Sequence, residues 1–400
     1  MPASLLYHTN QISDVQVKNT EYFNDKIVFH VLYEPKKTLC PCCGWTEHSF
    51  KGNKIRKLKM APLGNKAAFL SVELYRLKCG NCSHVWWPIL SFAKAKKRFT
   101  NSFEQYVVEL MRFSTIEHVA KFLRVSWSLI KNIHKAYLLR EYQSPDLKSI
   151  QYIGVDEFSI TKGHRYMTIF INLETGEIIH AIEGKSIENV SPFMLKLKKE
   201  AIQLKAIAMD MNAAYASAVR QFLPNVDIVF DRFHVVALLN TTIDEIRREQ
   251  QAKCNAAGLR VIKGMRFLLL SNYETLDFKK QKSLECLLEV NKPIAIAHAM
   301  KEQIRLFWTK PSLAEGARFL GWWIIDAFES GINELQKAGK TLLRHGMDLL
   351  NYFKHRITNG KTEGINNKIK TMKRQAYGFR DIDYFKLRLY NLHKVRYSFA

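Results

Sequence analysis

The chain has 400 residues and is 47% hydrophobic, which is enough to bury the cores of several domains and excludes a disordered tail. Its 61 Lys and Arg against 37 Asp and Glu give a net charge of +24, which favours a polyanionic partner such as nucleic acid. No apolar run approaches the roughly 18 residues that span a bilayer, and the first residues lack the plan of a signal peptide. We therefore expect a cytoplasmic protein with no membrane partner.

The basic excess is spread along the chain and is densest in three separate stretches, at 51–59, at 94–98 and in the last forty residues. A single basic stretch is usually a solvated face of a protein. Three such stretches predict several contacts with one long polyanion.

Four of the seven cysteines form two closely spaced pairs, 36 residues apart, and each pair has C-x-x-C spacing beside a glycine. Four thiolates in this pattern can hold a structural Zn²⁺ tetrahedrally. The expected ligands are Cys40, Cys43, Cys79 and Cys82, with Cys42, His48 and His84 as possible substitutes. A strand-like alternation at 68–77 lies between the pairs, so we expect a zinc ribbon within residues 1–98. Four unrelated buried thiols are the alternative.

A short alternating stretch at 26–33 predicts a strand before the first pair. From Phe103 the hydrophobic period becomes helical, and it leads into a stretch at 114–133 with a turn at Val125. This plan predicts a helix-turn-helix within residues 99–145. The outward residues at the start of its recognition helix would be Ser126, Trp127, Ser128 and Lys131. A plain helical hairpin without a DNA contact is the alternative.

Beyond residue 145 the pattern predicts three strands, then alternating helices and strands. The strands are expected at 150–160, 165–173, 177–183, 206–211 and 226–231, and the helices at 191–200 and 213–223. This is the order of an RNase H-like mixed sheet in an α/β protein, in which the first and fourth strands are neighbours. We expect the sheet domain to comprise 146–237 and 354–400, with an all-helical insertion at 238–353.

Three carboxylates are candidates for holding metal ions. Asp156 lies in an apolar strand, where an unpaired charge would cost several kcal/mol. Asp210 ends the fourth strand, which should place it opposite Asp156, and Glu363 stands at the start of a late helix. Two-metal phosphodiester chemistry needs such carboxylates. The alternative to metal binding is helix capping, by Asp210 for the helix that follows it and by Thr362 with Glu363 for the late helix. Glu157 is next to Asp156 on the same strand, so its side chain should point to the opposite face.

The zinc ribbon, the helix-turn-helix and several short motifs together resemble the ISL3 family of bacterial insertion-sequence transposases, which belong to the wider DDE class. The resemblance covers nearly the whole chain in the family's order. The motifs are Gly154-Val155-Asp156-Glu157-Phe158, Asp210-Met211-Asn212, Phe230-Asp231-Arg232-Phe233-His234, Thr362-Glu363-Gly364-Ile365-Asn366-Asn367 and Tyr377-Gly378-Phe379-Arg380.

This resemblance implies a catalytic triad of Asp156, Asp210 and Glu363 that binds two Mg²⁺ or Mn²⁺. It also implies that Asp231 and His234 form an aspartate-two-residues-histidine motif, with a role near the scissile phosphate or in ordering the site. Lys370, seven residues after Glu363, matches a basic residue that holds DNA, and Arg374 follows on the same helix. The same family segment contains Asn366 and Asn367, for which we derive no role from the sequence.

The expected activity is binding of the terminal inverted repeats of double-stranded DNA, cleavage at the element end and attack of the freed 3′-hydroxyl on target DNA. A homo-oligomer assembled on DNA in the bacterial nucleoid is expected. Two alternatives remain open. The first is another RNase H-like nuclease such as a resolvase, and the second is a non-catalytic regulator that uses only the ribbon and the helix-turn-helix.

Overall fold

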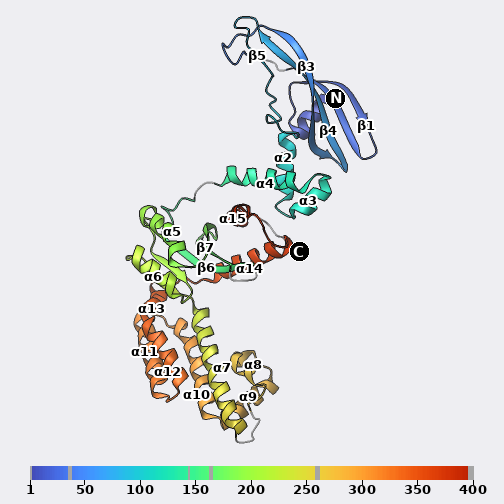
Figure 1. Cartoon of the computed structure of the whole chain (residues 1–400). Coiled ribbons are helices and arrows are strands. Elements are labelled where there is room, and N and C mark those ends of the chain that lie inside the picture. Colours follow the sequence, from blue (N-terminus) through green and yellow to red (C-terminus); the bar gives the residue numbers. More distant parts are fainter. Residues whose placement is uncertain (1, 35–37, 143–144, 162–164, 257–261, 395–400) are drawn as a thin grey trace. The chain divides into compact units, whose positions relative to one another are not determined.

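The structure is a computed structural model that describes residues 2–34, 38–142, 145–161, 165–256 and 262–394 (Figure 1). The chain forms two compact units, Met1–Gln143 with Asp381–Ala400, and Ser144–Arg380. The C-terminal segment from Asp381 therefore clusters with the N-terminal unit, and not with the sheet domain in which all of 354–400 is expected from the sequence. In the described part of the chain, no helix has the length and apolarity to cross a membrane.

The first unit begins with α1 (Pro2–Asn10) and a mixed sheet. Its strands are β1 (Val15–Tyr22), β2 (Lys26–Tyr33), β3 (His48–Leu63), β4 (Lys66–Cys79) and β5 (Val85–Trp86). The strand order is β1-β2-β4-β3, with β5 paired to β4. The strands predicted at 26–33 and 68–77 are confirmed as β2 and most of β4. The core of this sheet is apolar and includes Leu6, Leu58 and Leu70, each fully buried.

The hairpin of β3 and β4 is long, and its two halves differ in burial. Near the turn, Leu58 and Met60 pair with Leu70 and Ala68 and pack into the core. Toward the other end, residues 48–55 of β3 are all exposed. The cysteine pairs flank this exposed end, because one pair precedes β3 and the other closes β4.

Besides α1, the first unit contains α2 (Asn101–Leu110), α3 (Ile116–Leu123), α4 (Trp127–Glu141) and α15 (Ile382–Tyr390). Thr115 and Ser126 cap the starts of α3 and α4 by accepting backbone N–H groups, and Arg124 ends α3 in the left-handed conformation. The predicted two helices and their turn are therefore present. The imidazole of buried His134 on α4 lies 2.7 Å from the hydroxyl of Tyr384, which ties α15 to α4.

The second unit contains a five-stranded mixed sheet of order β10-β9-β6-β7-β8. Its strands are β6 (Tyr152–Thr161), β7 (Arg165–Asn172), β8 (Ile178–Glu183), β9 (Ala206–Met209) and β10 (Asp227–Phe230). The first three are antiparallel neighbours, whereas β9 pairs parallel with both β6 and β10. The predicted strands and the predicted adjacency of the first and fourth strands are confirmed.

Helices cover both faces of this sheet. Glu157 of β6 accepts a hydrogen bond from Tyr215 of α6 (Ala213–Phe222), which packs beside α5 (Ile187–Glu200). The start of α14 (Gly360–Gln375) lies against Gly154 of the same strand. Residues 154 and 157 point to opposite faces of a strand, so α6 and α14 lie on opposite faces.

The stretch between β10 and α14 is helical in its described parts, as predicted, although its first helix begins at Arg232 rather than at 238. The helices are α7 (Arg232–Ala256), α8 (Arg266–Leu270), α9 (Phe278–Val290), α10 (Lys292–Ile304), α11 (Leu313–Glu329), α12 (Asn333–Arg344) and α13 (Gly346–His355). Two short 3-10 helices, at Tyr273–Thr275 and Arg305–Thr309, also lie in this stretch, and another, at Leu392–Lys394, follows α15 in the first unit. One hydrophobic core runs from the sheet into these helices.

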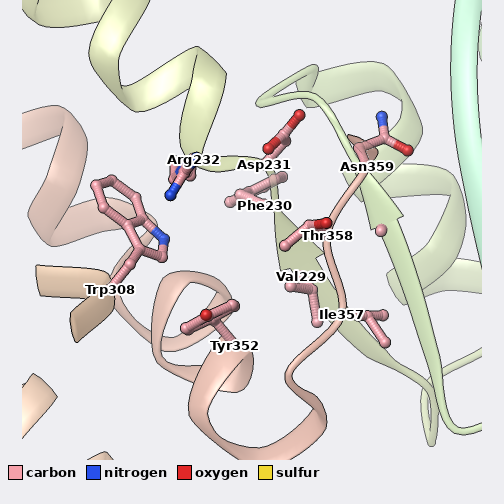
Figure 2. A pocket seen from close by; sticks show the side chains of 10 residues that line it. Val229, Phe230, Asp231, Arg232, Trp308, Tyr352, Ile357, Thr358 and Asn359 are labelled. Atoms are coloured by element: carbon pink, nitrogen blue, oxygen red, sulfur yellow. The ribbon is translucent and has the colours of Figure 1, made fainter. Parts of the chain in front are cut away.

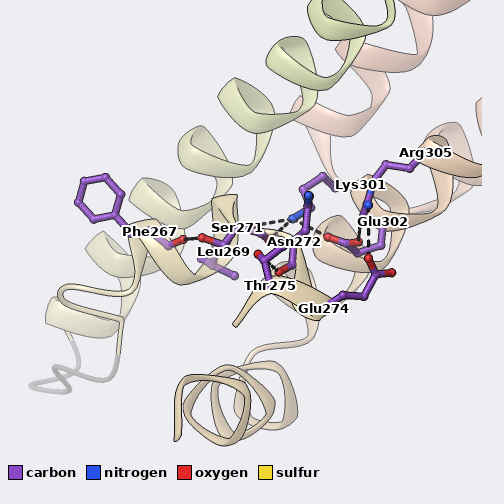
Figure 3. A network of polar contacts seen from close by, with 9 residues as sticks. All are labelled: Phe267, Leu269, Ser271, Asn272, Glu274, Thr275, Lys301, Glu302 and Arg305. Atoms are coloured by element: carbon purple, nitrogen blue, oxygen red, sulfur yellow. Dashed lines mark hydrogen bonds and ion pairs between the residues drawn. The ribbon is translucent and has the colours of Figure 1, made fainter. Parts of the chain in front are cut away.

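A buried lysine holds the far part of this helical region together (Figure 3). The ammonium of Lys301 donates to the carbonyl oxygens of Leu269 and Ser271, at 3.1 and 2.7 Å, and lies 2.7 Å from the carboxylate of Glu302. These contacts satisfy carbonyls at the end of α8, so the lysine fixes α8 on α10.

Candidate functional site

Three aspartates lie at equivalent positions on the three parallel strands of the second sheet. Gly154 of β6 pairs with Ala208 of β9, so Asp156 and Asp210, each two residues further on, are in register. Asp231 follows the last paired residue of β10, and its backbone N–H donates to Met209 at 3.0 Å. The carboxyl ends of parallel strands meet at one edge of a sheet, so this edge is acidic.

The acidic edge contains one imidazole. His234, in the first turn of α7, places Nε2 2.7 Å from a carboxylate oxygen of Asp210. This hydrogen bond raises the pKa of His234 above its ordinary value. Burial raises the pKa of Asp231, whose carboxylate accepts the N–H of Phe233 at 3.3 Å. His234 therefore pairs with Asp210 and fixes one orientation of that carboxylate.

Asp156 is the most perturbed carboxyl group of this edge. Burial, followed by the nearby charge of Asp210, raises its pKa from 3.8 to about 6. One of its oxygens accepts the N–H of Glu157 at 2.6 Å, and the other accepts a hydrogen bond from the amide nitrogen of Asn366 on α14. The role of Asn366, which we could not derive from the sequence, is thus a contact with the first aspartate.

Helix α14 approaches β6 closely because residue 154 is a glycine. A methyl group at that position would meet the Thr362 hydroxyl at 2.7 Å and a methyl of Leu173 at 2.8 Å. Lys361 holds the start of the helix by donating to the carbonyl oxygens of Leu173 and Glu174, at 2.7 and 2.9 Å. The glycine of the first motif thus serves the docking of the helix that carries the last motif.

Glu363 lies in the first turn of α14 with an exposed side chain, three residues before Asn366. Residues three apart are neighbours on a helix surface, so Glu363 lies on the side that approaches Asp156. In the part of the chain that the structure describes, however, the carboxylates of Asp156, Asp210 and Glu363 are not gathered as tightly as metal ligands. The structure thus brings Asp156, Asp210 and His234 together and leaves Glu363 one helical turn from Asn366.

Local contacts bear on the two capping interpretations and on the expected direction of Glu157. The cap of α6 is Asn212, which accepts the N–H of Ala214, so Asp210 is not a cap. Helix α14 starts at Gly360, so Thr362 lies inside its first turn and is not the N-cap. Glu157 contacts Tyr215 on the opposite face, as expected from strand alternation.

A small pocket opens beside Asp231, between the end of β10 and the loop that leads into α14 (Figure 2). Trp308 and Tyr352 come from the helical region, and Asn359 precedes α14. The pocket is lined by Ala208, Val229, Phe230, Asp231, Arg232, Trp308, Tyr352, Ile357, Thr358 and Asn359. Aromatic and polar groups from three parts of the second unit therefore meet next to the acidic edge.

The exposed face of α14 is basic beyond Glu363. Asn367, Lys370 and Arg374 follow at intervals of four, three and four residues, and all three are exposed. These intervals place them in line with Glu363 on one stripe of the helix. The stripe begins with a carboxylate and continues with two cations.

The four predicted cysteines converge at the exposed end of the hairpin. Cys40 and Cys82 place their Sγ atoms 3.6 Å apart, as do Cys43 and Cys79, and all four sulfurs lie within 4.8 Å of one another. Backbone N–H groups, first that of Cys82, lower the pKa of the Cys79 thiol to about 7. The group could hold a metal ion, and it does not include Cys42, His48 or His84.

The outward residues predicted at the start of α4 differ in their surroundings. Ser126, Trp127 and Ser128 are exposed, and the Ser126 hydroxyl caps the helix. Lys131 is partly covered, because its ammonium lies 2.8 Å from the carboxylate of Asp381. Donation by Lys131 lowers the pKa of Asp381, at the start of α15. Lys131 is therefore already paired with a carboxylate of its own unit.

Comparison with known proteins agrees with this arrangement. The pattern of the DDE transposase family ISL3, described as a transposase, matches residues 153–389. A second pattern, described as the helix-turn-helix domain of transposase family ISL3, matches residues 88–138. The first match contains all the carboxylates of the acidic edge and Glu363, and the second contains α3 and most of α4.

Two groups of relatives are similar over most of the chain. The transposase for insertion sequence element IS1001 of Bordetella parapertussis is 31% identical over 358 residues, which cover 88% of this chain and 88% of the relative. The transposase for insertion sequence element IS1557 of Mycobacterium tuberculosis is 24% identical over 371 residues, which cover 85% of this chain and 82% of the relative.

Proposed function

Because this chain belongs to the ISL3 family of DDE transposases, we propose that it cuts and joins DNA ends with two divalent cations held by Asp156, Asp210 and Glu363. The observation that carries the proposal is the register of Asp156 and Asp210 at one sheet edge, with α14 docked beside Asp156. The donors are carboxylate oxygens, which suit Mg²⁺ or Mn²⁺. When bound, such a pair of cations activates an attacking oxygen and stabilises the leaving oxygen of a phosphodiester.

We assign supporting roles to the groups around the carboxylates. His234 holds Asp210 in one orientation, and Asp231 lies near enough for its charge to raise the pKa of His234. Lys370 and Arg374, on the stripe that begins at Glu363, would contact phosphates of the strand that leaves the site. These contacts would position the DNA without reading its sequence.

The second sheet supports an RNase H-like fold for this unit. Three antiparallel strands are followed by two that pair parallel, and β9 lies beside β6. In this interpretation the helical stretch α7 to α13 is an insertion between the second aspartate and the glutamate. The shared hydrophobic core would keep that insertion fixed to the sheet.

The first unit would recognise the terminal inverted repeats of the element. The four cysteines are soft thiolate donors, which suit a structural Zn²⁺ with no open position for chemistry. Ser126, Trp127 and Ser128 would face the major groove from the start of α4. An element has two ends and each chain has one acidic edge, so we propose that at least two copies assemble on the DNA.

A strand-transfer assay tests this function. The full-length protein, an oligonucleotide with the element's end and a target plasmid are incubated with Mg²⁺ or Mn²⁺, and cleaved and joined products are separated on a gel. We expect both products from the wild type and neither from Asp156→Asn, Asp210→Asn or Glu363→Gln, all three of which should still bind the end. Cleavage without joining would contradict the transposase reaction, and an active Asp156→Asn variant would contradict the metal assignment.

A further inference from the structure

The side chain of Asn366 contacts Asp156 with one end of its amide, and at the other end it has a buried oxygen without a hydrogen-bond partner in the described part of the chain. The residue is only 9% exposed, and its amide nitrogen donates to Asp156. Its carbonyl oxygen is buried and has no hydrogen-bond partner among the residues that the structure describes. Because a carboxylate accepts hydrogen bonds and does not donate them, only the nitrogen end of the amide can face Asp156. The orphaned oxygen is a consequence of that orientation.

A buried acceptor without a partner lowers the stability of the fold. A leucine of similar size would fill the same space without that cost. Packing alone therefore does not explain an amide at position 366. What the amide provides and a leucine does not is an N–H group directed at the carboxylate of Asp156.

The two oxygens of Asp156 are held from different elements. One accepts the N–H of Glu157 on its own strand, at 2.6 Å, and the other accepts the amide of Asn366 on α14. Together these bonds fix the rotation of the carboxylate, and each oxygen keeps a lone pair for a cation. The second bond also links Asp156 to the helix that carries Glu363, one turn earlier.

We propose that Asn366 is a positioning residue that aligns the carboxylate of Asp156 with Glu363 for cation binding. This inference rests on the proposed function, because it assumes that both carboxylates bind the same pair of ions. Outer groups that orient metal ligands commonly control the affinity for the metal. The amide acts through Asp156 and does not itself touch the DNA.

The docking of α14 does not depend on this amide. Lys361 donates to two backbone carbonyls, and Lys373 donates to the carbonyl of Ser159. Ile369 and Met372 of α14 are themselves buried. Removal of the amide should therefore leave the helix in place and disturb only the orientation of Asp156.

The test compares Asn366→Leu with Lys361→Met in the full-length protein. For each we measure Tm, affinity for an end oligonucleotide, the Mn²⁺ concentration that gives half-maximal cleavage, and Mn²⁺ binding by electron paramagnetic resonance of the free ion. We expect Asn366→Leu to keep its Tm within about 3 °C and its DNA affinity within about twofold. Its half-maximal Mn²⁺ concentration and its Mn²⁺ dissociation constant should both rise about tenfold or more. Lys361→Met should lower Tm with a smaller shift in the Mn²⁺ requirement.

Wild-type Mn²⁺ binding in Asn366→Leu would overturn the proposal. So would a loss of Tm in Asn366→Leu as large as that in Lys361→Met, because the amide would then be a structural tether. Failure of the proposed function gives a different result, since the wild type itself would show no divalent-cation-dependent cleavage. The two failures are thus distinguished by the wild-type protein alone.

Discussion

Asp156 is the residue at which burial, like charge and hydrogen bonding meet. Its pKa is raised to about 6, first by burial and then by Asp210. A carboxyl group with a raised pKa binds its proton more tightly in the folded state than in the unfolded state. The free energy of unfolding therefore falls as pH rises from about 4 to about 6, and the loss is complete at neutral pH. The rise in the pKa of Asp156 from 3.8 to about 6 corresponds to a cost on the order of 3 kcal/mol.

This cost predicts that Asp156→Asn is more stable than the wild type at pH 7.5 and loses that advantage near pH 4. Divalent cations should relieve the same repulsion, so Mn²⁺ should raise the Tm of the wild type and have little effect on the variant. Thermal unfolding of both proteins at the two pH values, with and without Mn²⁺, measures these shifts. A variant that is less stable at pH 7.5, or that gains as much from Mn²⁺, would contradict this account of Asp156.

At the scale of elements, the contact between α14 and β6 positions the site. The strand contributes Asp156, the helix contributes Glu363 and Asn366, and their approach depends on the missing side chain of Gly154. The Thr362 hydroxyl, which would meet a side chain there, is fully buried and 2.5 Å from the side-chain oxygen of Asn359. The start of the helix therefore has little room to move aside.

We predict that Gly154→Ala displaces the start of α14 and separates Glu363 from Asp156. Overpacking of this kind costs about 1 to 3 kcal/mol, and end cleavage should fall at least tenfold. Gly321→Ala is the matched control, because Gly321 lies in α11 with no atom within 4 Å of an added methyl group. The control should gain up to about 1 kcal/mol from helix propensity and keep its activity. Equal cleavage by both variants would show that the spacing does not matter.

The elements also show which parts of the fold and the site are predictable from the sequence. Alternating or continuous apolar stretches predicted β2, β4 and all five strands of the second sheet, because each strand buries one or both faces. Strand β3 was not predicted, since residues 48–55 are exposed and lack an apolar alternation. The sequence predicts the start of α7 at residue 238, whereas the helix starts at Arg232. Its first turn includes His234, a polar residue of the acidic edge, and so lacks a clear helical apolar pattern.

The candidate site was predictable in its residue types but not in its contacts. Strand order alone brought Asp156 and Asp210 together, and the structure agrees. The bond from Asn366 to Asp156 joins residues 210 positions apart and depends on the depth to which α14 docks. Nor does any local pattern around Lys131 indicate its pairing with Asp381, which lies 250 residues away in α15's cap.

At the scale of the whole molecule, two units with separate cores divide the groups that could bind metals. The four thiolates lie in the first unit, and the carboxylates at the edge of the second sheet lie in the other. Soft thiolates suit Zn²⁺, whereas carboxylate oxygens suit Mg²⁺ or Mn²⁺. Recognition and chemistry are therefore expected to use different ions in different units.

We expect the segments around Asp156, Asp210 and Glu363 to bind the same cations, and iron-mediated cleavage of the polypeptide can detect this shared binding. Fe²⁺ replaces Mg²⁺ in the zinc-loaded protein bound to an end oligonucleotide, and ascorbate with peroxide then generates hydroxyl radicals at the bound iron. Mass spectrometry of the fragments should reveal cuts near all three residues, which excess Mg²⁺ suppresses and Asp156→Asn removes. Cuts that spare the region of Glu363, or that persist in the variant, would contradict the account.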